Sequence, residues 1–125
     1  MIRWDAHEVA ALGVELPKLG FKAAKVLDGV FAEGARDIEA KWRDNATLTA
    51  GDHGKHYPKS IDHERLLGTD IAFEIGPNPA KRQGGMSFEE GSVNQPPHLD
   101  GQHAADEVVP RIERRVDSAL GLLGL

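Results

Sequence analysis

The longest amphipathic stretch of the chain, residues 21–44, constrains the fold more than any other feature. Its apolar residues recur at helical spacing along one face, and charged residues cover the opposite face. This pattern predicts a long α-helix with one buried side. Gly29 and Gly34 interrupt the stretch, and each weakens such a helix by about 1 kcal/mol relative to alanine. We therefore expect close packing against a partner element to compensate.

The remaining elements follow from shorter patterns. Asp5 is a candidate N-cap for a helix over 6–16, within an N-terminal helical segment spanning 1–20. Residues 45–60 lack a sustained period and predict a long surface loop. Alternating residues over 60–94 predict an antiparallel meander of about three to four strands. A closing amphipathic helix is predicted over 100–123.

Within the meander, the clearest strand is predicted over 69–75. Two shorter strands are predicted over 60–64 and 86–88. A chain of 125 residues has room for one core. We therefore predict a single α+β domain over 1–125, in which the C-terminal helix packs on one face of the sheet.

Composition narrows the functional classes. The net charge of −5 argues against a protein that binds nucleic acid through a basic surface. The chain has no cysteine, which excludes disulfides and thiolate chemistry. No segment is apolar over the roughly 18 residues that span a bilayer, and the N-terminus lacks the apolar core of a signal peptide. These features predict a protein made in the cytoplasm.

Three histidines form the best candidate metal site. His53, His56 and His63 lie close together in the sequence, and histidines a few residues apart are a common half of a zinc site. The same run suggests a metal-dependent histidine nuclease, in which one histidine activates water. The adjacent Lys55 opposes a bound cation, and HExxH is absent. These residues are weak metal candidates, and the sequence indicates no cofactor.

The stretch 84–101 concentrates acidic residues, glycines and prolines between predicted elements. Glu89 and Glu90 are adjacent, so in a strand they point to opposite faces and cannot act as a catalytic pair. One of them, with Gly91, is expected to shape a turn or take an inter-subunit hydrogen bond. Ser92 lacks the GxSxG setting of a nucleophile. We identify no catalytic residue, and the chain is not predicted to be an enzyme.

Short motifs follow one another in a distinctive order. After the helix over 21–44 come Lys59-Ser60-Ile61, then Glu74-Ile75-Gly76-Pro77, then Phe88-Glu89-Glu90-Gly91-Ser92, and finally Gln95-Pro96-Pro97-His98-Leu99 before the last helix. In this order the chain resembles the minor tail or neck proteins of tailed bacteriophages, a family that includes tail-completion and head–tail joining proteins. The resemblance covers roughly residues 21–123. His98 stands where the family usually has phenylalanine, and the run from His53 to Lys59 departs from the family's usual loop.

The resemblance implies a virion protein that acts without catalysis at the head-proximal end of the tail. The implied partners are further copies of the chain in a ring (a hexamer is one candidate symmetry), other neck and tail proteins, and DNA that passes through the lumen without sequence-specific binding. A small adaptor module of the cytoplasm remains an alternative, as does the nuclease. The expected subunit-interface residues are Phe88, Glu89, Glu90, Gly91, Ser92, Val93, Asn94, Pro96, Pro97 and His98. The expected loop contacts are His53, Lys55, His56, Tyr57, Lys81 and Arg82.

Overall fold

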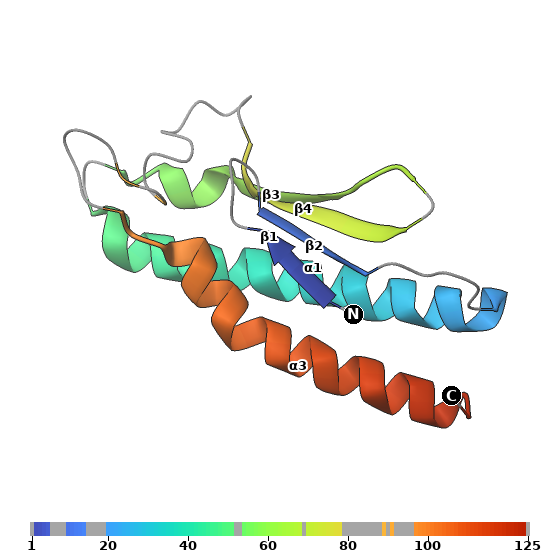
Figure 1. Ribbon diagram of the computed structural model, residues 1–125. Helices are drawn as coiled ribbons and strands as arrows, with labels where there is room; N and C mark the ends of the chain where they lie inside the picture. The colour runs from blue at the N-terminus through green and yellow to red at the C-terminus, as the bar shows by residue number, and fades with distance from the viewer. Residues whose placement is uncertain are drawn as a thin grey trace.

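The computed structural model describes residues 2–5, 10–14, 20–51, 54–68, 70–78, 89, 91 and 97–124. An antiparallel sheet lies on one long helix, and a second long helix packs along the first on the same side of the sheet (Figure 1). This is the predicted α+β arrangement. Among the described residues, neither helix is both long and apolar enough to cross a membrane.

Seven elements make up the described fold. In chain order they are β1 (Ile2–Asp5), β2 (Ala10–Val14), α1 (Phe21–Ala50), the 3-10 helix η1 (Tyr57–Ser60), β3 (Ile61–Arg65), β4 (Ile71–Pro77) and α3 (Asp100–Leu122). The sheet order is β1-β2-β4-β3, and all pairs are antiparallel. In the described sheet, β1 and β3 are therefore the edges.

The strand β4 confirms the clearest strand prediction. Ile71, Phe73 and Ile75 are buried against the helices, while Ala72 and Glu74 on the other face are only half-buried. This alternation is the expected pattern for a sheet with one covered face. The neighbouring β3 confirms the strand predicted to begin at 60–64, whereas the strand predicted over 86–88 lies outside the described residues.

The prediction of an N-terminal helix over 6–16 is wrong. Residues 2–5 and 10–14 form β1 and β2, and Leu12 pairs with Phe73 of β4. The backbone groups of β4 need a partner strand on this side, and pairing with β2 satisfies them. Gly13 fits this position because an added Cβ would lie 3.1 Å from the Ile71 carbonyl oxygen. Tertiary pairing here overrides a helical pattern that was only about three turns long.

The surface loop predicted over 45–60 is largely wrong. Helix α1 continues to Ala50, because the buried residues Ala46 and Ala50 extend its apolar stripe. Small side chains there left little hydrophobic periodicity in the sequence. Tyr57–Ser60 then forms η1, in which Tyr57, Pro58 and Ser60 are buried. The predicted C-terminal helix is confirmed as α3.

The two glycines inside α1 have opposite environments. At Gly34, an added Cβ would lie 2.5 Å from Cδ1 and 2.7 Å from Cγ1 of Ile112, so this glycine allows α1 and α3 to approach closely. Gly29 is exposed, and an added Cβ there would meet no described atom within 4 Å. The expected packing compensation therefore holds within the described chain for Gly34 only.

This contrast predicts stability changes of opposite sign. Gly34→Ala should lower the free energy of unfolding by about 1 to 2 kcal/mol, since overpacking a core costs about 1–3 kcal/mol and the gain in helix propensity offsets part of it. Gly29→Ala should raise it by up to about 1 kcal/mol. Urea unfolding of dilute protein measures both, and a stabilised Gly34→Ala variant would contradict the helix crossing described above.

Candidate functional site: a junction around Trp42

Trp42 of α1 lies where the ends of several elements meet. Its buried indole contacts Gly101 in the first turn of α3, where an added Cβ would lie 2.7 Å from three ring atoms. A Cβ at Gly76 of β4 would lie 3.7 Å from Cη2 of the same ring. We call the surrounding set of buried residues the Trp42 junction. It comprises Trp42, Tyr57, Ser60, Gly76, Glu89, Asp100 and Gly101.

Glu89 caps the N-terminus of α3 from a separate segment. Its Oε1 accepts a hydrogen bond from Gly101 N at 2.8 Å, and its Oε2 accepts one from Gln102 N at 2.9 Å. The Glu89 carbonyl oxygen also accepts from Leu99 N at 3.0 Å. Leu99, the N-cap residue, has a positive φ of 56° and no capping side chain. The carboxylate therefore satisfies N–H groups that a helix start leaves unpaired.

Burial sets the ionisation of Glu89. The side chain is 2% exposed, and this desolvation raises the pKa of its carboxyl group above the usual value. The two backbone hydrogen bonds oppose the rise, the nearby Asp100 adds to it, and His103 opposes it. The sequence predicted that Glu89 or Glu90 shapes a turn or takes an inter-subunit hydrogen bond; in the structure both carboxylate oxygens of Glu89 bond within the chain.

Asp100 joins α3 to the last turns of α1. It is fully buried, and its Oδ2 accepts a hydrogen bond from Thr49 Oγ1 at 2.7 Å. Asn45 Nδ2 donates to the Asp100 carbonyl oxygen at 3.0 Å, and His98 Nδ1 lies 3.7 Å from Oδ2. These contacts fix the direction in which α3 leaves the junction.

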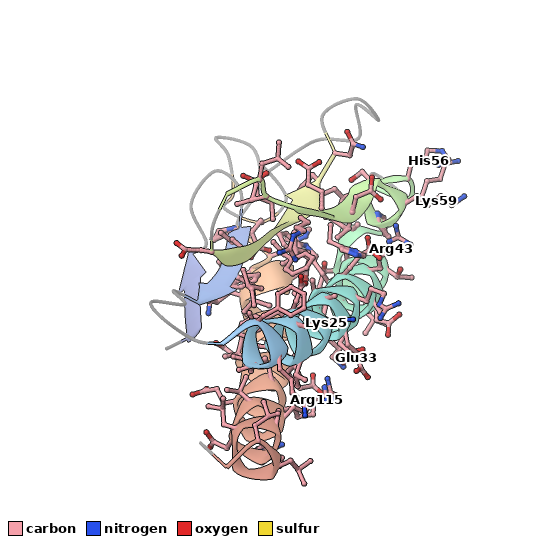
Figure 2. All side chains as sticks on the ribbon, turned by 90° about the vertical axis from the view of Figure 1, so that its right-hand side faces the viewer. Lys25, Glu33, Arg43, His56, Lys59 and Arg115 are labelled. Carbon is pink, nitrogen blue, oxygen red and sulfur yellow. The ribbon has the colours of Figure 1, made fainter. Side chains whose placement is uncertain are left out.

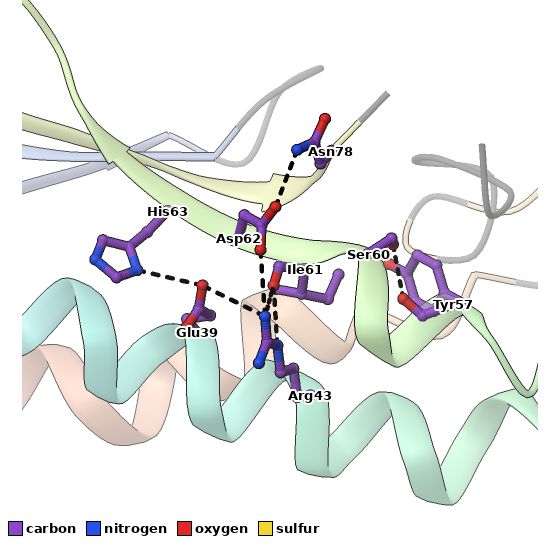
Figure 3. A network of polar contacts seen from close by, with 8 residues as sticks. All are labelled: Glu39, Arg43, Tyr57, Ser60, Ile61, Asp62, His63 and Asn78. Carbon is purple, nitrogen blue, oxygen red and sulfur yellow. Dashed lines mark hydrogen bonds and ion pairs between the residues drawn. The ribbon is translucent and has the colours of Figure 1, made fainter. Parts of the chain in front are cut away.

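The Ser-Ile and Gly-Pro motifs also meet here. Ser60 Oγ donates to the Tyr57 carbonyl oxygen at 2.7 Å (Figure 3). The Ser60 carbonyl oxygen accepts from Asn78 N at 2.7 Å. Ile61 pairs with Pro77 across β3 and β4. The structure corrects the prediction that Tyr57 is a loop contact, because its side chain is fully buried. That burial raises the pKa of its hydroxyl well above the usual range, against an opposing contribution from Trp42.

A polar network attaches β3 to α1 beside the junction. Arg43 donates to the Ile61 carbonyl oxygen through Nε at 2.9 Å and through Nη2 at 2.6 Å, and Nη2 also lies 3.2 Å from Asp62 Oδ1 (Figure 3). Asn78 Nδ2 donates to Asp62 Oδ2 at 3.0 Å. The network holds the edge strand β3 on the helix.

The histidines do not form a metal site in the part of the chain that the structure describes. His63 Nδ1 lies 3.2 Å from Glu39 Oε1, His56 is exposed, and His53 is outside the described residues. No group of three His, Cys, Asp or Glu side chains among the described residues is placed to hold a metal ion.

The remaining predicted contact residues divide into two groups. Among the described ones, Lys55 and Pro97 are exposed, His98 is half-buried beside Asp100, and Gly91 has a positive φ of 86° that favours glycine. The others lie outside the described residues: Phe88, Glu90, Ser92, Val93, Asn94, Pro96, Lys81 and Arg82.

Sequence reasoning missed that Trp42 and Gly101 contact each other. A glycine at the second position of a predicted helix was the available signal, because glycine lowers helix stability and is usually kept only where another group approaches its backbone closely.

No known protein family, curated protein or solved structure matches the chain.

The junction predicts that Gly101→Ala is destabilising. Helix propensity alone would make the change favourable by about 1 kcal/mol, but the added methyl group would overlap the rigid indole, so we expect a net loss of about 2 kcal/mol. The matched control is Gly121→Ala, at an exposed position of α3 with no described atom within 4 Å. Urea midpoints measure both, and equal effects of the two variants would refute the contact.

The Glu89 cap predicts a pH-dependent effect. Because the folded-state pKa of Glu89 is raised, its contribution to stability is complete below the pKa of an unfolded glutamate and is lost as the pH rises through the folded-state value. Glu89→Gln loses one acceptor, and we expect a deficit of about 1–2 kcal/mol at acid pH. The deficit should narrow as the pH rises.

Urea unfolding of both proteins between about pH 4 and pH 8 measures this effect. Glu113→Gln, at an exposed position of α3, is the matched control and should leave stability nearly unchanged. A deficit that stays constant with pH, or widens toward alkaline pH, would contradict the raised pKa.

Proposed function

We propose that this chain is a structural subunit of the neck of a tailed phage or prophage, a tail-completion protein that forms a ring at the head–tail junction. One observation carries the proposal. The short motifs whose order resembles that family, although far apart in the sequence, converge at the Trp42 junction: Ser60-Ile61 and Gly76-Pro77 lie side by side, and Glu89 binds the start of α3.

The chemistry of the junction favours a structural role. Glu89 and Ser60 hydrogen-bond to the backbone, and Asp100 bonds to the Thr49 hydroxyl and, through its carbonyl oxygen, to Asn45. These hydrogen bonds hold the ends of helices and strands in place. Such a frame suits a protein whose function lies in the geometry of its assembly.

The distribution of exposed apolar side chains favours head-to-tail assembly. Phe21 at the start of α1, Leu67 in the β3–β4 turn and Leu122 at the end of α3 are each at least 86% exposed. These three segments lie at the same end of the molecule (Figure 1), and Leu48, 85% exposed, lies near the other end of α1. Apolar surfaces at opposite ends can close a ring through heterologous contacts.

In the proposed ring, the acidic chain would let DNA pass without binding it. Non-specific attachment to DNA is driven by Lys and Arg side chains that displace the counterions of the phosphates. The chain has a net charge of −5, so acidic residues outnumber these basic ones. The subunit would be assembled in the bacterial cytoplasm and incorporated into the virion.

Deleting the gene from its phage or prophage tests the proposal. We expect DNA-filled heads and free tails that fail to join, visible by electron microscopy, and rescue by a plasmid copy. Peptide mass spectrometry of purified wild-type particles should find the chain in a small, fixed copy number. Complete particles that lack the chain would refute the proposal.

Elemental analysis of the purified protein provides an independent check on the nuclease alternative. A stoichiometric transition metal that is lost in His53→Ala and His56→Ala variants would favour the nuclease over the structural role. We expect these variants to leave assembly intact.

A further inference from the structure

The exposed face of α1 contains a ridge of three residues at four-residue intervals: Lys25, Gly29 and Glu33. Residues four apart form one of the ridges by which helices pack together. All three are exposed, and Figure 2 shows Lys25 and Glu33 on the same flank of the molecule. We call these residues the Gly29 ridge.

Nothing in the described part of the chain explains why position 29 is a glycine. Its φ is not positive, and no described atom lies within 4 Å of where its Cβ would be. It therefore weakens α1 without allowing a turn or a close intramolecular approach there. Gly34, further along the helix on the buried side, shows what such a glycine does when an element packs on it: Ile112 occupies the space of its Cβ.

The charges of the ridge have no ion-pair partner among the described residues. Lys22, Arg36 and Asp44, also exposed on α1, likewise have no ion pair within the described chain, whereas charged residues along the flanks of the helix are paired. Those flanking residues form the pairs Asp28–Arg65, Asp37–Arg115, Glu39–His63 and Lys41–Glu107. The ridge thus places one positive and one negative charge at equal distances on either side of an exposed glycine.

We propose that the Gly29 ridge binds the same ridge of a second copy, with the two α1 helices antiparallel and crossing at Gly29. Two-fold symmetry then places Lys25 of each copy opposite Glu33 of the other, so the arrangement forms two ion pairs. Glycine at the crossing point lets the helix backbones approach closely enough for these side chains to meet.

The geometry also accommodates the like charges further out. Lys22 and Arg36 would face each other seven residues from the crossing point, about 10 Å along each axis. Helices that pack through four-residue ridges cross at about 50°, so their axes have separated laterally by roughly 9 Å at that point and the long side chains can diverge. Val26, 38% exposed, would lie beside Ala32 of the second copy and add apolar contact.

This contact goes beyond the proposed function and does not depend on it. An isologous pair closes on itself, whereas the ring contacts proposed above are heterologous. The contact would therefore join two subunits, or two rings.

Sedimentation velocity of the full chain, from micromolar to near-millimolar concentration, tests the proposal. Wild-type protein should form a dimer that weakens with salt. Lys25→Glu and Glu33→Lys should each raise the dimer Kd about tenfold or more, because each replaces two attractions by two repulsions. An equimolar mixture of the two variants should restore association, since in the mixed dimer each introduced charge faces one of opposite sign.

The matched controls reverse charges on the exposed side of α3. Arg114→Glu and Asp117→Lys change the net charge by the same amounts as the two ridge variants and should leave the dimer Kd within about twofold. If the wild-type chain stays monomeric throughout the range, or if the mixture associates no better than either variant alone, the proposal is overturned.

Gly29→Ala separates assembly from folding. The variant should unfold at a temperature about 4 °C higher as a dilute monomer, because alanine favours the helix. Its dimer should nevertheless be weaker, by about fivefold or more in Kd, since the methyl group holds the helices apart. A Gly29→Ala protein that dimerises as well as wild type would also overturn the proposal.

Discussion

The contact between the Trp42 indole and the backbone of Gly101 is the one on which the rest of the fold depends. It brings the first turn of α3 onto α1, next to Gly76 in the last part of β4. Once α3 starts there, Glu89 can reach its free N–H groups and Asp100 can reach Thr49. The polar contacts then secure an arrangement that close packing makes possible, since a Cβ at position 101 would exclude the ring.

The two glycines inside α1 lie on different sides of the helix: Gly34 faces α3, and Gly29 is exposed. Gly34 allows α3 to pack closely on α1. Gly29 lowers the stability of α1 to a similar extent, but no described atom lies within 4 Å of where its Cβ would be. Helix propensity treats them alike, yet only one is explained by the fold of a single chain. The proposed head-to-tail contacts at the ends of the molecule and the proposed α1 pairing use different faces, so a subunit can engage both at once.

The candidate site was only partly predictable. Composition and motif order singled out the segment around Glu89 and the start of α3 at Asp100, but they did not predict that Glu89 caps α3. A carboxylate that caps a helix from a separate segment leaves no local pattern, unlike a capping box within one turn. Tyr57 was misassigned for a similar reason: a segment rich in turn-forming residues predicts exposure, yet η1 buries it against α1.

The sequence by itself determined the two long helices, the strand β4 and the α+β class, because their hydrophobic periods are long enough to specify which face is buried. It also predicted β3, although Ile61 is the only apolar residue of that strand. Only the tertiary structure decided the rest. Residues 10–14 became a strand because β4 required a partner, and α1 continued through alanines because α3 and η1 cover them. Short or weakly apolar segments take the conformation that satisfies their neighbours' backbone and packing, and this information lies in the neighbours rather than in the segments themselves.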